Sequence, residues 1–508
     1  MRHFILILAT GTGLLACNGG SDTDTASTTE TPQAMAGDPG AAAATANGVR
    51  ETVEGLRGVS RSDPSTLTPR QSSAQDPGPR DTVGDEGAQL DGLTAPQSYA
   101  FQVGKADFLE VEEPDEGLGP TFNLDSCGGC HAQPAAGGTS PKSNPQVNMA
   151  NAANKLPSFI TANGPVREAR FVRNADGSPD GGVHGLFTVT GRAGAETCML
   201  TQPNFARELA RNNVIFRIPT PVFGAGLIES IPDSEILKNQ ASASSTKQAL
   251  GIRGRPNVLL TGNSISGQPN RNGNDGTIGR FGHKAQNKSL LIFSGEAYNV
   301  EMGVSNLAFP TERDETDGCR DLAMSPNSEA NFDPPPPVDP QAPHYPAVDG
   351  LSAIEKFTVF MRFLAPPKQS LNVKNATEAS ITSGRQLFTD TGCALCHTPS
   401  LNTYAKASVP AMAGKTVNLF SDLLLHDMGT GLADGIQQGQ ASGREFRSAP
   451  LWGLGQRLFF LHDGRTSDLR QAIREHYSSG SEANGVTQRF FNLPDAQQQD
   501  LLNFLRSL

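Results

Sequence analysis

Aromatic side chains, long apolar runs and positive charge are all scarce in this chain. Aromatic residues make up 6% of the 508 residues, with one Trp and five Tyr, whereas glycine and proline are abundant. This balance predicts a loop-rich fold in which bound cofactors supply part of the apolar core. Beyond the N-terminus, no apolar run approaches the roughly 20 residues of a membrane-spanning helix. The formal net charge of −11 argues against nucleic acid as a partner.

Cysteine is also scarce, with seven positions, and four of them lie in two copies of one string: CGGCH at 127–131 and CALCH at 393–397. Cys-x-x-Cys-His is the attachment signature of c-type haem. Its thiols bond the two vinyl groups, and the histidine lies under the iron as axial ligand. A redox dithiol would not need the histidine, and a zinc site would need four ligands drawn together. The sequence therefore predicts two covalent haem c groups, held by Cys127, Cys130 and His131 and by Cys393, Cys396 and His397.

The first 17 residues are typical of an export signal. A short polar and basic start is followed by an apolar stretch, Phe4–Leu15, and a lipobox that ends at Cys17. We expect Cys17 to carry the lipid of a bacterial lipoprotein; the alternative is an ordinary signal peptide with a chance cysteine. Attachment of haem c takes place outside the bacterial cytoplasmic membrane, so the periplasmic side is expected. Asn18, in place of the Asp that commonly retains lipoproteins at the inner membrane, favours the outer membrane.

Residues 18–96 have few large apolar side chains and are rich in Gly, Ala, Ser, Thr, Asp and Pro. Such a composition cannot bury enough surface to fold, so it predicts a flexible stalk. The two cysteines outside the lipobox and the haem strings, Cys198 and Cys319, are predicted to form a disulfide, because the compartment is oxidising. A pair that cycles between thiol and disulfide is the alternative.

We expect a mainly α fold with few short strands, divided into an N-terminal haem domain (97–370, with a long insertion) and a C-terminal domain (371–508). The proline-rich segment Asp333–Pro346 is expected to be a surface connection.

The strings FR and PVFGAG at 216–226 echo FR and PLWGLG at 446–455, which indicates two related domains. Leu290–Phe293 is assigned to a helix or loop. Helices are predicted at Ala353–Phe363, Ala379–Phe388, Ser467–Tyr477 and Pro494–Leu508.

Everything after the stalk resembles the bacterial di-haem oxidoreductases, often labelled thiol oxidoreductases, which are cousins of the di-haem cytochrome c peroxidases and of the methylamine-utilisation di-haem enzymes. The resemblance implies two cytochrome c-like haem domains. It rests on GLGPTFN at 117–123, GGVH at 181–184, GLIESIP at 226–232, GRFGHKA at 279–285, EMG at 301–303, LLHDMG at 424–429 and HDGR at 462–465.

In the peroxidases, a ligand of the C-terminal haem follows the His-Asp-Gly element by fourteen residues, which is His476 here. The cousins carry Met or Tyr at this position, so the chain departs from both. An imidazole there would favour a low-spin iron at a lower potential than Met ligation gives. The alternative is a surface histidine.

The resemblance also places Glu301 over the N-terminal haem, in an acidic-Met-Gly motif. Such a carboxyl can take the first proton of hydrogen peroxide and return it to the leaving oxygen; the alternative is an exposed or helix-capping Glu. The glutamine that the peroxidases place nearby corresponds to Phe293, which speaks against simple peroxidase chemistry.

His283 stands where the peroxidases carry a tryptophan between the haems, and three roles remain open: a distal ligand, a relay residue or a packed polar side chain. His184 is a further candidate iron ligand at the N-terminal haem. His426 and His462 are expected to bond haem propionates or backbone, and Arg447 and Arg465 are either propionate partners or solvated.

The favoured hypothesis is a lipid-anchored di-haem oxidoreductase of peroxidase type. Electrons from a cytochrome or small redox protein would enter at the C-terminal haem, and peroxide or another small molecule would react at the N-terminal haem. The alternatives are a non-catalytic electron carrier, perhaps linked to iron acquisition, and a binding protein with architectural haems. The sequence leaves open whether a calcium ion lies between the domains, as in the peroxidases.

Overall fold

The structure is a computed structural model that describes residues 72–81, 85–259, 264–265, 268–269, 277–311, 314, 316–319 and 345–508. All of these belong to one compact unit of the chain, Asp63–Leu508. The expected signal peptide, its lipobox cysteine, most of the expected stalk and nearly all of the proline-rich connection with His344 lie outside the described residues. Within the described ranges, no helix is both long enough and apolar enough to cross a membrane.

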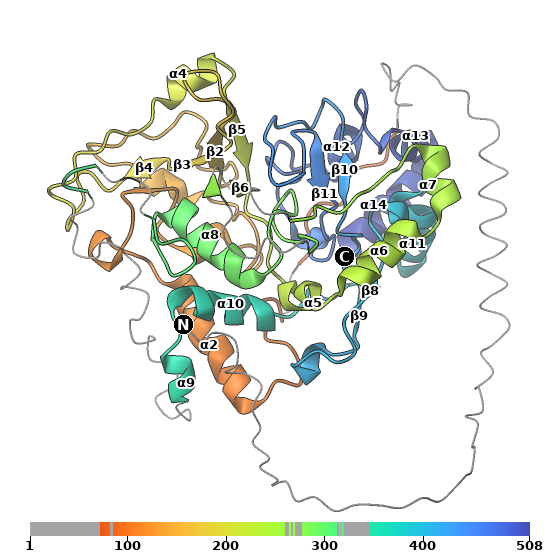
Figure 1. Cartoon of the computed structure of the whole chain (residues 1–508). Helices are drawn as coiled ribbons and strands as arrows, with labels where there is room; N and C mark the ends of the chain where they lie inside the picture. Colours follow the sequence, from red (N-terminus) through yellow and green to blue (C-terminus); the bar gives the residue numbers. More distant parts are fainter. Residues whose placement is uncertain are drawn as a thin grey trace, which may run out of the picture. The chain divides into compact units, whose positions relative to one another are not determined.

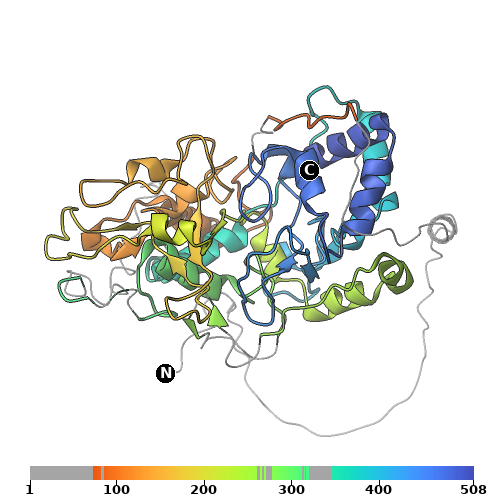
Figure 2. The ribbon, with the colours of Figure 1, turned by 90° about the horizontal axis from the view of Figure 1, so that it is seen from above.

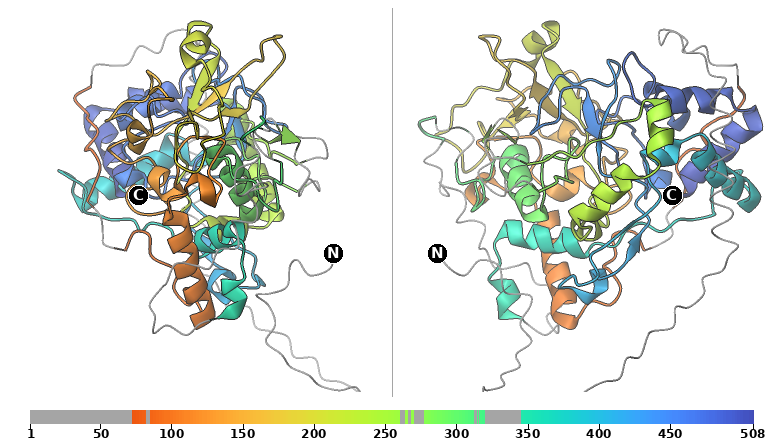
Figure 3. Two further views of the ribbon diagram at one scale, coloured as in Figure 1. Left: turned by 90° about the vertical axis from the view of Figure 1, so that its left-hand side faces the viewer. Right: turned by 45° about the vertical axis from the view of Figure 1, so that its right-hand side comes forward.

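Helices dominate the regular structure, and three of them form the frame of the N-terminal half: α2 (Ala95–Leu109), α8 (Leu290–Met302) and α10 (Ala353–Phe363). Helix α10 packs along α2 and against α8 (Figures 1 and 3). The close approach of α2 and α10 requires Gly104, because a Cβ there would lie 2.2 Å from the carbonyl oxygen of Lys356. The Lys356 ammonium is itself buried and pairs with Asp107 of α2 at 3.1 Å, which ties the two helices together.

A second frame is formed by α11 (Glu378–Asp390) and α14 (Asp495–Ser507), which pack directly on each other. With α12 (Leu469–Glu475) and α13 (Asn484–Asn492) they form the cluster of helices at the C-terminal end of the chain (Figure 2). Its apolar core is built of Phe and Leu side chains, among them Phe388, Phe490, Phe504 and Leu501.

The strands are short and antiparallel. The largest sheet has three, in the order β3 (Val183–His184), β2 (Glu168–Phe171) and β5 (Val214–Arg217). The other pairs are β1 (Thr121–Phe122) with β4 (Phe187–Thr188), β6 (Ser264–Ile265) with β7 (Gln268–Pro269), β8 (Leu401–Asn402) with β9 (Thr416–Val417), and β10 (Leu425–Asp427) with β11 (Glu445–Arg447).

The remaining helices of the described residues are short. They are α3 (Cys127–Cys130), α4 (Phe205–Ala210), α5 (Ala225–Glu229), α6 (Asp233–Ala241), α7 (Ser244–Leu250) and α9 (Pro346–Asp349), and the 3₁₀ turns η2 (Pro114–Glu116), η3 (Pro145–Asn148), η5 (Cys393–Leu395), η6 (Pro410–Met412) and η7 (Leu454–Gln456).

The internal echo seen in the sequence corresponds to an echo in local structure. Strand β5 leads to Gly224, which begins α5, and strand β11 leads to Gly453, which begins η7; both glycines are left-handed. The two cysteine strings also fold alike, since each forms one tight turn. In both turns the histidine N–H donates to the carbonyl of the first cysteine, at 3.0 Å for His131 and 2.9 Å for His397.

The predicted helices are confirmed within a few residues: Ala353–Phe363 is α10, and the other three are α11, α12 and α14. Leu290–Phe293 begins α8. The predicted disulfide between Cys198 and Cys319 is present, and both half-cystines are buried.

The stalk predicted for residues 18–96 was wrong at its C-terminal end. Asp76 forms an ion pair with Arg506 of α14 at 2.6 Å, and the Arg80 N–H donates to Gly455 at 2.8 Å. Composition predicted disorder here because this segment has few apolar side chains. It is held instead by polar contacts to the C-terminal helices, which a composition argument cannot detect.

Candidate functional site: two cavities at the cysteine strings

Each of the two cysteine strings lines its own cavity, about 280 Å³ at residues 393–397 and about 150 Å³ at residues 127–131. A buried water needs about 10–15 Å³ of such volume, and protein interiors contain few voids larger than one water. Both cavities are therefore far larger than packing defects. The four cysteines of the strings are free thiols, unlike Cys198 and Cys319.

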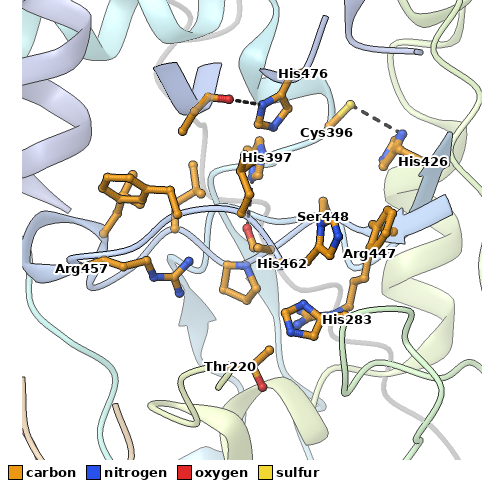
Figure 4. Close-up of a pocket in the computed structure, with 18 of the residues that line it drawn as sticks. Thr220, His283, Cys396, His397, His426, Arg447, Ser448, Arg457, His462 and His476 are labelled. Carbon is orange, nitrogen blue, oxygen red and sulfur yellow. Dashed lines mark hydrogen bonds between the residues drawn. The ribbon is translucent and has the colours of Figure 1, made fainter. Parts of the chain in front are cut away.

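Two histidines meet in the larger cavity, His397 of the second string and His476 at the C-terminal end of α12 (Figure 4). The Nδ1 of His397 bonds the carbonyls of Phe420 and Ala449, each at 3.1 Å, and the Nδ1 of His476 bonds that of Ala472 at 2.8 Å. A carbonyl only accepts, so Nδ1 carries the proton in both rings and Nε2 keeps its lone pair.

Both imidazoles are neutral near pH 7. Burial, together with the nearby His476, lowers the pKa of His397 to about 4, and burial lowers the pKa of His476 as well. A neutral imidazole with a free Nε2 is the form that binds a metal. The local fold that presents His476 begins at Asp468, which caps α12 by accepting the N–H of Gln471 at 2.6 Å.

The smaller cavity has one histidine prepared in the same way. The Nδ1 of His131 bonds the carbonyl of Gly138 at 3.0 Å, and burial lowers the pKa of the ring. Of the other histidines in the described ranges, His283 alone also lines this cavity.

Two carboxyl groups take the place of a second prepared imidazole in the smaller cavity: Glu301 on α8 and Glu168 on β2. They are hydrogen-bonded to each other. Burial and the adjacent charge of Glu168 raise the pKa of Glu301 well above its usual value. Burial alone would raise the pKa of Glu168 too, but Arg170 and Arg217 hold it at about 2. The pair therefore keeps one proton, which resides on Glu301.

The surroundings of the pair are polar and fixed. The Asn123 amide donates to Oε2 of Glu301 at 2.9 Å, which leaves Oε1 to carry the proton. Arg170 forms an ion pair with Glu168 and also donates to the carbonyl of Gly181 at 2.9 Å. Phe293 lines this cavity and the larger one as well, and it brings no polar group to either.

A common wall separates the two cavities, because both are lined by Ile218–Thr220, Val222, Gly282, His283 and Phe293. The Nε2 of His283 lies 3.1 Å from the carbonyl of Ile218, and its ring meets that of His462 edge-on at 6.3 Å. Burial and the Arg217 cation lower its pKa well below the usual value, so this ring is neutral. The structure thus places His283 between the cavities.

Two arginines enter the larger cavity without a carboxylate partner among the described residues: Arg447 and Arg457. Burial lowers the pKa of each to about 10. Arg447 donates through Nε to the carbonyl of Gly282 at 3.0 Å. Buried guanidinium groups normally pair with anions, so the cavity is ready for a ligand with carboxylate groups.

Two of the residues expected near propionates, His426 and Arg465, have other partners, whereas His462 lines the larger cavity. His426 lies between Glu482 and Asp422, at 2.9 and 3.0 Å, so carboxylates occupy both of its nitrogens. Arg465 pairs with Asp463 and Glu475 and does not line either cavity. The prediction that Arg465 pairs with a haem propionate was therefore wrong. His462 lines the larger cavity, stacked on Phe446 at 4.4 Å, and burial lowers its pKa to about 4.

His184 does not reach either cavity, which corrects its prediction as an iron ligand. It pairs in register with Ala169 of β2, whereas the cavity-lining side chains of β2 are Glu168 and Arg170. Successive side chains of a strand point to opposite faces, so His184 faces away. It bonds Asp180 at 3.0 Å and stacks on Phe171.

Sequence reasoning missed Glu168, Arg457 and Tyr298, which line the cavities. None of the three lies in a motif that the sequence singled out. The only available signal was the alternation of side chains along β2, which would place Glu168 on the buried face of the strand. A strand of four residues is too short for this alternation to be recognised in the sequence.

Residues 168–508 match the protein family described as "Di-haem oxidoreductase, putative peroxidase". The match covers more than half of the chain, so the protein belongs to the di-haem oxidoreductase family. Membership implies haem cofactors. Among curated protein sequences, none matches the chain.

Three solved structures show weak similarity. The di-haem peroxidase BthA of Burkholderia thailandensis E264 is 15% identical with a TM-score of 0.28; the match covers 45% of this chain and 65% of BthA, less than two thirds of it. Hydrazine synthase of Kuenenia stuttgartiensis is 17% identical with a TM-score of 0.22, and the match covers 57% of this chain and 88% of the synthase chain. A MauG-like protein associated with microbial copper homeostasis is 15% identical with a TM-score of 0.29, and the match covers 57% of this chain and 90% of that protein. All three TM-scores are low.

The residues present fit two haems. Most of the lining surface of each cavity is apolar, although the smaller cavity also has many polar side chains, and each cavity offers two free thiols and an imidazole with an open Nε2. The larger cavity adds two cations without a carboxylate partner in the described ranges, which suit haem propionates. No cluster of three or more His, Cys, Asp and Glu that could hold a separate metal ion occurs in those ranges.

Proposed function

We propose that this protein is a lipid-anchored di-haem c oxidoreductase of peroxidase type, with one covalent haem in each of two cytochrome c-like domains (97–370 and 371–508). The observation that carries the proposal is the asymmetry of the cavities. One offers two imidazoles with free Nε2 atoms, His397 and His476, whereas the other offers His131 and a proton-sharing carboxyl pair, Glu301 with Glu168.

A haem in the N-terminal cavity supplies an iron at which peroxide can be bound and reduced. Cys127 and Cys130 would hold the ring there, and His131 would offer its Nε2 to the iron. Glu301 lines this cavity and would pass its proton to the leaving oxygen of a peroxide, while the proton of the oxygen that stays bound would return to the Glu301–Glu168 pair. Glu168 holds that proton on Glu301, since Arg170 keeps Glu168 ionised.

The C-terminal cavity suits a site that only carries electrons. A haem bound there would find two imidazoles with free Nε2 atoms, His397 and His476, for its iron, and the guanidinium groups of Arg447 and Arg457 would be available to its propionates. Electrons from a cytochrome or small redox protein would enter here and cross the shared wall at His283. His283 is thus assigned to the relay between the sites.

Replacement of Glu301 by Gln tests the catalytic assignment. Glu301→Gln cannot release the proton, so turnover with peroxide should fall by about 10²–10⁴-fold while both haem spectra are preserved. Glu208→Gln is the matched control, because Glu208 is buried but bonds Asn213 and Arg207 away from both cavities. Full activity of Glu301→Gln would remove Glu301 from the mechanism.

The carrier alternative is separated by electron paramagnetic resonance of the oxidised and one-electron-reduced protein. A high-spin ferric signal that changes on addition of peroxide supports the enzyme. Only low-spin signals, unmoved by peroxide, would mean that both irons are fully ligated, and His283 would then be the first candidate for the extra ligand.

The location rests on the sequence. We place the lipid on Cys17 and the protein at the periplasmic face of the outer membrane. Fractionation that finds it only in the inner membrane would overturn the second assignment.

A further inference from the structure

Tyr298 lines the N-terminal cavity and has no part in the function proposed above. It lies on α8 one turn before Glu301, so the two side chains share a helix face. The side chain is 2% exposed, and its ring packs edge-on against Phe357 at 5.0 Å. The phenol O–H donates to Oε1 of Glu112 at 2.7 Å. Buried tyrosine hydroxyls usually find a partner, but here the partner is an acid.

Glu112 connects this phenol with the protein surface. It does not line the cavity, is itself half-buried, and lies in the segment after α2 next to Val111, which is 52% exposed. Its backbone N–H donates to the carbonyl of Asp125 at 2.8 Å, two residues before Cys127. Cys127 is also near enough to Tyr298 to raise the pKa of the phenol, after burial and Glu112. The pair therefore extends from the predicted haem attachment point to the solvent.

We propose that Tyr298 and Glu112 form a proton-coupled redox site that carries oxidising equivalents from the N-terminal haem towards the surface. The Tyr298 O–H bond breaks: its electron reduces the peroxide-oxidised haem site, and its proton moves to the Glu112 carboxylate. A one-electron donor at the surface then returns the electron, and Glu112 returns the proton. The proposal rests on the function proposed above, because hydrogen peroxide is the oxidant.

The local charges make the electron and the proton move together. Burial and the Glu112 charge raise the pKa of Tyr298 well above its usual value, so the phenol does not ionise by itself. Burial raises the pKa of Glu112 to about 8 although the hydrogen bond from Tyr298 opposes this rise; the charges of Glu110, Glu116 and Asp107 add to it, and Asp107 itself pairs with Lys356. Only the ionised Glu112 can take the proton, so Tyr298 oxidation should increase as the pH rises through about 8.

The chain offers a matched control in Tyr99. This tyrosine is also buried, at 7% exposure, and its hydroxyl also donates to a carboxylate, Oδ1 of Asp349, at 2.9 Å. It does not line either cavity. If the radical depends on Tyr298 and not on Tyr99, its formation requires a tyrosine beside the cavity and not merely a buried tyrosine.

The experiment treats the holo-protein with one equivalent of hydrogen peroxide, freezes it at intervals and records electron paramagnetic resonance. A tyrosyl radical should form in the native protein and in Tyr99→Phe, and should be lost in Tyr298→Phe. Glu112→Gln accepts the hydrogen bond but not the proton, so radical formation should slow by about 10²–10⁴-fold and lose its pH dependence. Haem absorbance spectra of each variant report that it has folded and loaded.

The outcomes separate the two proposals. If peroxide changes the haem signals but no tyrosyl radical forms, or if the radical persists in Tyr298→Phe, the relay is overturned and the peroxidase function stands. If peroxide leaves the haem signals of the native protein unchanged, both are overturned.

Discussion

His397 and His476 line one cavity, and each ring donates its Nδ1 proton to a backbone carbonyl. The two rings come from distant parts of the chain, the turn η5 and the end of α12, yet they are prepared for a metal in the same way. The hydrogen bonds fix each tautomer, and burial keeps each ring neutral.

This relationship predicts the behaviour of His476 variants. His476→Ala should convert the C-terminal haem from low spin to high spin, because the second imidazole is lost, and His476→Met should raise its midpoint potential. Ferric electron paramagnetic resonance and a redox titration measure these changes. Tyr477→Phe, at the next position, is the control. A low-spin signal that survives in His476→Ala would show that another group binds this iron.

Glu168 should set the pH range of activity through Glu301. In Glu168→Gln the adjacent negative charge is gone, so the pKa of Glu301 falls and its proton is lost at a lower pH. The alkaline limit of turnover with peroxide should shift to lower pH. Turnover should also fall by about 10–100-fold, the range found when an outer-shell partner of a metal site is removed. If Glu168→Gln has the same pH–rate profile as the native protein, Glu168 has no role in the mechanism.

Arg457 should raise the potential of the C-terminal haem. Its guanidinium has no carboxylate partner in the described part of the chain, so its charge acts on the cavity. Arg457→Gln should lower the midpoint potential by tens of millivolts, on the order expected for one charge at about 10 Å and an effective dielectric constant near 20. Arg474→Gln, an exposed position on α12 outside the cavity lining, should change nothing. An equal shift in both variants would contradict a local effect.

Asp76 should stabilise the C-terminal helices. Its pair with Arg506 is buried, and removing one partner of such a pair costs about 3–5 kcal/mol. Asp76→Asn should therefore lower the free energy of unfolding measured with denaturant, whereas Asp176→Asn, at an exposed position, should not. Burial opposes ionisation of Asp76, but Arg506 lowers its pKa below 3.8. The contribution is therefore complete above pH 3.8 and is lost as the pH falls further. Equal stability of the two variants would contradict a structural role for this segment.

Much of the architecture could be predicted because it depends on local patterns. Helix α10 follows from the apolar spacing of Ala353–Phe363, and α12 from the cap at Asp468. The disulfide followed from counting, since Cys198 and Cys319 were the pair left over. The packing of residues 72–81 could not be predicted, because Asp76 and Arg80 are held by partners more than 370 residues away.

The same division applies to the site. The sequence by itself determined the two cysteine strings and the positions of His476 and Glu301, because covalent attachment and motif spacing are properties of the chain. Only the tertiary structure decided that Glu168 faces Glu301, that His184 faces away and that His283 lies in the shared wall. These placements depend on strand register and on contacts between distant segments, and the pKa of a carboxyl depends on which charges such contacts bring beside it.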